Sequence, residues 1–153
     1  MSYRLFHKFP LLPLLLLLSS GALMPVIPAP ASEWETFAQT KASTFYYEKG
    51  YARPEGNIIV RVRILPREDT AEGNRERLGI VNRLTARGVK EANVFAFSER
   101  EEIIDCQANR YYFRRTKYFD GSSVKFAEDE SGVGWRSVKA GTPIGKLKSI
   151  VCK

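Results

Sequence analysis

The chain has 153 residues, with 24 lysines and arginines against 17 aspartates and glutamates, a formal net charge of +7 and 44% hydrophobic residues. The only histidine, His7, would be removed with the signal peptide described below, and the two cysteines would be oxidised, which argues against a zinc site and against a triad that needs a histidine base. We therefore predict a protein that is not an enzyme and that has no metal and no cofactor.

Residues 1–31 have the pattern of a secretory signal peptide. Arg4 and Lys8 form a basic start, Leu11–Leu18 is a short apolar core, and Ala29-Pro30-Ala31 is an A-x-A cleavage signal. The alternative is an uncleaved anchor, although the apolar run is shorter than the roughly 20 residues of a spanning helix. No cysteine lies near the end of this core to carry a lipid.

We therefore expect an exported protein of the periplasm or cell surface, not lipid-anchored, with no transmembrane segment after cleavage. The mature chain would be 32–153, about 122 residues and one domain, large enough for a real core. Its formal charge would fall from +7 to about +5, because Arg4 and Lys8 leave with the signal.

Two cysteines remain in the predicted mature chain, Cys106 and Cys152. An even count in an oxidising compartment indicates one disulfide, and two free buried thiols are the alternative. The bond would close a loop of about 45 residues and stabilise the fold by roughly 4 kcal/mol in the chain-entropy model.

The first half of the mature chain has the features of an antiparallel sheet. Strands are predicted at 33–40, 43–47 and 57–65, the last with apolar residues at every second position from Ile58 to Ile64 and with Arg61 and Arg63 between them. One buried face and one wet face are typical of antiparallel sheets.

A helix is predicted at 75–87, with Leu78, Val81, Leu84 and, less clearly, Ile80 as its apolar side and Gly88 as its stop. Further predicted elements are an extended segment at 93–97, a hairpin strand at 124–127, a short strand at 135–138 and a helix at 143–151. Thr142 and Pro143 form the start of that last helix, and its apolar side should lie on the sheet, held by Cys152 to Cys106. The predicted fold class is α+β: a single antiparallel sheet of about six strands, a C-terminal helix packed on it, and one disulfide.

The stretch Glu101–Asp120 is the most basic and aromatic part of the chain, and we predict that it forms one long, bent central strand. Strict alternation puts Arg110, Tyr112 and Arg114 on one face, and Arg115 and Lys117 on the other, unless a bulge switches the faces midway. The two faces in full are Cys106, Ala108, Arg110, Tyr112, Arg114, Thr116 and Tyr118 against Tyr111, Phe113, Arg115, Lys117 and Phe119.

A set of motifs in a fixed order covers nearly the whole mature chain. They are an early Trp34, Phe45-Tyr-Tyr47, Asn57-Ile-Ile-Val-Arg-Val62, Glu102-Ile-Ile-Asp-Cys106, Arg110–Arg114, Tyr118-Phe-Asp-Gly121, Trp135, Gly141-Thr-Pro143 and Val151-Cys152. In this order they resemble the bacterial surface-adhesin protein E family. The resemblance implies an antiparallel sheet with a C-terminal helix held by the cysteine pair, on an envelope protein that binds host extracellular and plasma proteins.

The best candidate for a binding surface is the basic aromatic run, with Arg110, Tyr112, Arg114, Arg115 and Lys117 as the candidate residues. Arginine supplies planar donors for carboxylate, sulfate or phosphate, and aromatic rings add contact area. A single-face site would use Arg110, Tyr112 and Arg114, and a site at the exposed strand end would use Arg114, Arg115 and Lys117. The partners would be host or envelope proteins or polyanions, and we expect no nucleic acid for an exported chain.

The structural alternative for this run is a central strand whose arginines pair with carboxylates across the sheet, and it is the reading that we favour. The acidic clusters 99–102 and 128–130 are predicted to be solvated edges rather than a carboxylate site. The alternative functions are a periplasmic structural or accessory protein without adhesion, or a small periplasmic enzyme, which would need a concave pocket with a perturbed carboxylate.

Overall fold

The computed structural model describes residues 33–130 and 134–153, so the predicted signal peptide at 1–31 lies outside the described residues. The elements in chain order are β1 (Trp34–Gln39), β2 (Ser43–Glu48), β3 (Asn57–Pro66), α1 (Ala71–Ala86), a 3-10 turn η1 (Lys90–Val94), β4 (Phe95–Asp105), β5 (Arg110–Asp120), β6 (Lys125–Asp129), β7 (Arg136–Ser137) and α2 (Pro143–Val151).

The strands form one antiparallel sheet in the order β1-β2-β3-β4-β5-β6, and the short β7 pairs with the beginning of β5. Each long strand therefore neighbours the next in sequence. This arrangement confirms the predicted fold class, with seven strands instead of about six. The predicted strand at 57–65 is confirmed as β3, in which Ile58, Val60, Val62 and Ile64 are all buried.

The segment Glu101–Asp120, which we predicted to be one strand, contains the end of β4, a turn and all of β5. This division accounts for the additional strand. β4 ends at Asp105, whose carboxylate accepts a hydrogen bond from the backbone N–H of Ala108 at 2.9 Å. Asn109 then takes a left-handed backbone conformation with φ of 51°, which Asn tolerates better than most residues, and β5 begins at Arg110. Cys106 consequently lies in a turn and not in the middle of a strand.

The helix predicted at 75–87 begins four residues earlier than expected, at Ala71. Thr70 is its N-cap, because its hydroxyl accepts a hydrogen bond from the backbone N–H of Gly73 at 3.0 Å. Ile80 and Leu84 form the buried side, whereas Leu78, predicted to be apolar core, is 54% exposed. The end of the chain matches its prediction: α2 spans 143–151 behind a Thr142 cap.

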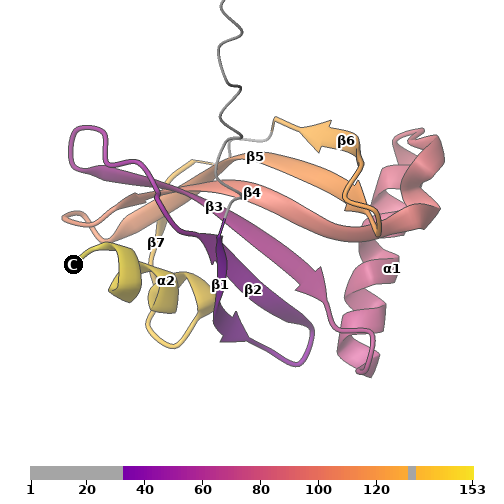
Figure 1. Ribbon diagram of the computed structural model, residues 1–153, viewed down its shortest axis with the longest axis horizontal. Coiled ribbons are helices and arrows are strands. Elements are labelled where there is room, and N and C mark those ends of the chain that lie inside the picture. The colour runs from indigo at the N-terminus through magenta and orange to yellow at the C-terminus, as the bar shows by residue number, and fades with distance from the viewer. Residues whose placement is uncertain (1–32, 131–133) are drawn as a thin grey trace, which may run out of the picture. The chain divides into compact units, whose positions relative to one another are not determined.

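Both helices cover the same face of the sheet, which we call the inner face; the opposite face is the outer face. Leu147 and Val151 of α2 pack with β3 residues and Ile104, while Ile80 and Leu84 of α1 pack with Phe95 and Tyr118. The two helices lie near opposite ends of the long strands (Figure 1). The middle of the inner face is therefore left between two separate apolar clusters.

A disulfide joins the turn after β4 to the end of α2, as predicted. Cys106 and Cys152 are 46 residues apart in sequence, and their Cα atoms are 5.7 Å apart. This distance is within the range that the bond requires. The bond fixes α2 over the end of the inner face, and α2 thereby becomes one wall of the cavity described below.

Candidate ligand-binding site

The five predicted binding residues come together on the outer face. The register places Arg110 opposite Asp105, Tyr112 opposite Ile103 and Lys117 opposite Glu99. Between these positions β5 has a bulge, in which Arg114 and Arg115 together oppose Glu101. Because of the bulge, Phe113 and Thr116 both lie on the inner face while Arg114 and Arg115 both lie on the outer face, so strict alternation along the run was wrong.

On the outer face the arginines are paired with carboxylates. Arg110 Nε lies 3.0 Å from an Asp105 oxygen, Arg114 Nε donates to Glu101 at 2.9 Å, and Arg115 Nε lies 3.0 Å from Glu128. Their side chains are 47%, 52% and 36% exposed, respectively. Most of the positive charge in the run is thus neutralised locally, which agrees with the structural alternative. A role of these residues in binding stays a prediction.

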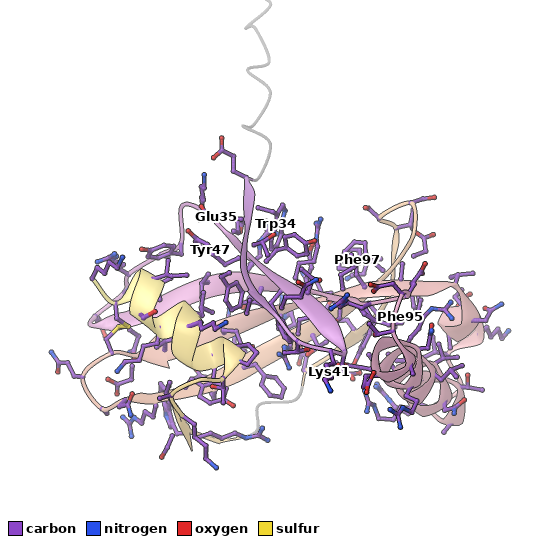
Figure 2. All side chains as sticks on the ribbon, turned by 90° about the horizontal axis from the view of Figure 1, so that it is seen from below. Trp34, Glu35, Lys41, Tyr47, Phe95 and Phe97 are labelled. Atoms are coloured by element: carbon purple, nitrogen blue, oxygen red, sulfur yellow. A yellow bond between two sulfur atoms is a disulfide. The ribbon has the colours of Figure 1, made fainter. Side chains whose placement is uncertain are left out.

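The outer face continues in the same manner over the neighbouring strands. Arg63 donates to Glu99 at 2.7 Å, and its guanidinium lies 4.3 Å from the ring centre of Trp34 and 4.6 Å from that of Phe97. Figure 2 shows Phe97 on the side away from α1 and Phe95 beside α1. A register shift between these two phenylalanines accounts for their opposite directions. The outer face is therefore covered by aromatic rings and ion pairs that contact one another.

The inner face holds a cavity of about 630 Å³, a volume typical of small-molecule sites. Its floor is formed by side chains of β3, β4 and β5, one wall by Phe37 and Phe45 of the first two strands, and the other by α2 and the segment before it. A second hollow of about 520 Å³ lies beneath α1 and shares Arg100 and Phe113 with the first. The cavity occupies the part of the inner face that neither helix cluster fills.

Glu102 lies on the floor of this cavity and is only 3% exposed. Its Oε1 is 3.3 Å from Arg100 Nε, at an angle that makes no hydrogen bond, and its Oε2 has no hydrogen-bond partner among the described residues. Burial raises the pKa of Glu102 above its ordinary value, and the nearby charges of Arg100 and Arg136 offset this in part. A buried carboxyl oxygen without a donor is costly, because its lost hydration is not replaced.

Positive charge surrounds Glu102. The guanidinium of Arg100 lies 5.0 Å from the ring centre of Phe113, and that of Arg136 lies 5.6 Å from the same ring. Arg136 and Lys139 are exposed at the cavity's edge, on β7 and on the segment before α2. The cavity therefore has three cations against one carboxyl.

These residues were missed in the sequence, where the cluster 99–102 was predicted to be a solvated edge. That prediction is wrong for Glu99 and Glu102, which are 8% and 3% exposed. The signal that could have identified them is their position in the two-residue alternation of the strands. Pairing of β4 with β3 places Glu102 opposite Val60 and Arg100 opposite Val62, and both valines are on the buried face. Arg136 and Lys139 carried no comparable signal, because they reach the cavity only through the pairing of β7 with β5.

No family model, curated protein or solved structure matches the chain. Within the described parts of the chain, no three His, Cys, Asp or Glu side chains gather so that they could hold a metal ion. Neither of the two helices described has the length and apolar run that crossing a membrane requires. The cavity itself is therefore the basis for a functional hypothesis.

Proposed function

We propose that the chain is an exported, non-enzymatic binding protein that holds a small ligand in the inner-face cavity. The observation that carries this proposal is the buried Glu102 carboxyl, whose Oε2 lacks a partner in a cavity of about 630 Å³. A polar group in this state is unfavourable for folding alone and is understandable where a ligand supplies the missing hydrogen bond.

Binding is favoured over catalysis by the composition of the cavity wall. Glu102 is the one carboxyl among the described residues that line it, whereas carboxylate catalysis generally uses two acids with divergent pKa values. The Thr142 hydroxyl is already engaged, since it donates to the Lys139 carbonyl at 2.6 Å and accepts from Gly145 N–H. Neither a cysteine nor a histidine lines the described cavity wall.

Export is supported by the disulfide, because such bonds persist in oxidising compartments. The resemblance to surface-adhesin protein E adds an envelope location, in the periplasm or at the cell surface, and a capacity to bind host proteins to the proposal. Binding of a macromolecule would use the outer face, where Arg110, Arg114 and Arg115 are already paired. We therefore place ligand binding on the inner face.

The test uses three compounds with one phenylbutyl body: 4-phenylbutyrate, 4-phenylbutanol and 4-phenylbutylamine. Ser137 lines the cavity and is exposed, so Ser137→Trp should obstruct the opening without disturbing the core. Ser122→Trp, in the exposed turn after β5, is the matched control. Calorimetry and ligand-observed NMR should detect at least one compound on the native protein and the control but not on Ser137→Trp. If none of the three binds, the proposed function is wrong.

A further inference from the structure

Resting on the proposed function, we infer that the ligand is an amphipathic organic anion, with an acid group held between Arg136 and Arg100 and an apolar body held against the aromatic wall. Charged and apolar side chains line different parts of the cavity, and this distribution indicates both the chemical class of the ligand and its orientation.

The charges of the cavity favour an acid group. Arg100, Arg136 and Lys139 face it from β4, β7 and the segment before α2, and Glu102 is the opposing carboxyl. Arg136 has no ion pair among the described residues, in contrast to the arginines of the outer face, and its planar donors suit a carboxylate. An anion between Arg136 and Arg100 would balance the excess of positive charge.

The remainder of the wall favours an apolar body. Phe37 and Phe45 come from the first two strands, Val62 from β3, and Ile144 and Leu147 from α2. Phe37 and Phe45 contact each other with ring centres 6.1 Å apart, and Phe37 also contacts Tyr47 edge-on. The strands that carry Phe37 and Phe45 lie on the far side of β3 and β4 from β5 and its partner β7, so an acid at Arg136 directs the rest of the ligand toward the rings.

Glu102 fits this orientation as a hydrogen-bond donor. A protonated carboxyl can donate from Oε2 to the ligand's acid group, whereas a charged carboxylate beside it would repel that group. The other groups facing Glu102 are Arg100, Arg136, Lys139 and Tyr111; the facing residues of β1, β2, β3 and α2 carry no charge. Binding of the anion should therefore favour proton uptake and weaken as pH rises.

The test compares the affinities of the phenylbutyl acid, alcohol and amine for the native protein. The acid should bind at least tenfold more tightly than the alcohol, and the amine most weakly. Arg136→Gln should reduce acid affinity roughly tenfold and leave alcohol affinity unchanged, because one charge-assisted contact is lost. Arg75→Gln removes a charge from the solvent side of α1, where the side chain is 73% exposed, and is the matched control.

Glu102→Gln tests the donor role, because glutamine has the same shape, is neutral and keeps a donor. It should retain acid binding and lose the decline in affinity at higher pH. Equal binding of acid and alcohol, or preference for the amine, would overturn the inference while leaving the proposed function intact. Absence of binding by all three compounds would overturn both, so the two failures are distinguishable.

Discussion

Removal of the disulfide by the double substitution Cys106→Ala/Cys152→Ala should strongly destabilise the fold. The bond closes a loop with a sequence separation of 46 residues. The chain-entropy relation gives about 4 kcal/mol for a loop of that length. With an unfolding entropy of about 2.1 cal/mol/K per residue over roughly 120 residues, Tm should fall by about 16 °C.

The assay is urea unfolding and thermal melting followed by circular dichroism, with the reduced native protein as a second comparison. The effect should be local as well as global, because without the bond α2 is held by packing and by a few exposed or half-buried hydrogen bonds, such as Lys148 to Asn109 at 2.8 Å and Arg53 to the Val151 carbonyl at 3.3 Å. Hydrogen exchange should accelerate more over 143–151 than over β3. Leu147 and Val151 are 1% and 0% exposed, so α2 should still dock in the folded variant. A loss below about 1 kcal/mol, or equal acceleration in α2 and β3, would refute the reasoning.

Two further predictions concern charge. Glu102→Gln should stabilise the fold increasingly as pH rises. Burial raises the pKa of Glu102 in the folded protein above its ordinary value of 4.5, so the native protein loses folding stability as the pH rises from 4.5 through this raised pKa. Gln does not titrate, so the variant does not suffer this loss. Urea unfolding from pH 4 to pH 8 checks this, and a pH-independent difference would contradict it. Arg114→Gln/Arg115→Gln should cost about 0.5–2 kcal/mol, since half-exposed ion pairs contribute little each. Heparin binding should not change; weaker heparin binding at full stability would instead support the predicted outer-face site.

The sequence predicted the parts of the fold that depend on local pattern. Alternation identified β3, and the Thr142-Pro143 pair identified the start of α2, because period and cap chemistry are encoded within a few residues. The beginning of α1 was missed. Thr70 was a cap signal, but the charged residues around it have the pattern of a loop. Their helical conformation becomes evident only from the packing of the helix against the sheet.

The cavity could not be predicted in the same way, because it depends on non-local pairing. The side chain of Glu102 is placed by its position opposite Val60 and Phe113, on two different strands. The bulge after Phe113, which puts Arg114 and Arg115 together on the outer face, leaves no mark in the residue pattern of β5 itself. The five predicted binding residues were found together on the outer face, but the carboxylates that pair with them come from neighbouring strands.

The contrast in charge pairing between the two faces is the reason for proposing the ligand site on the inner face. On the outer face, Arg110, Arg114 and Arg115 each have a carboxylate within about 3 Å, so an incoming anion would have to displace an existing partner. In the cavity, Glu102 has an unpaired oxygen and Arg136 has no ion pair among the described residues, so an anion there adds partners and competes only with the contact between Arg100 and Glu102 at 3.3 Å. The desolvation cost of Glu102 has already been incurred during folding, and a ligand acid group recovers part of it through a hydrogen bond. An anion therefore gains more on the inner face, although the outer face contains more arginines.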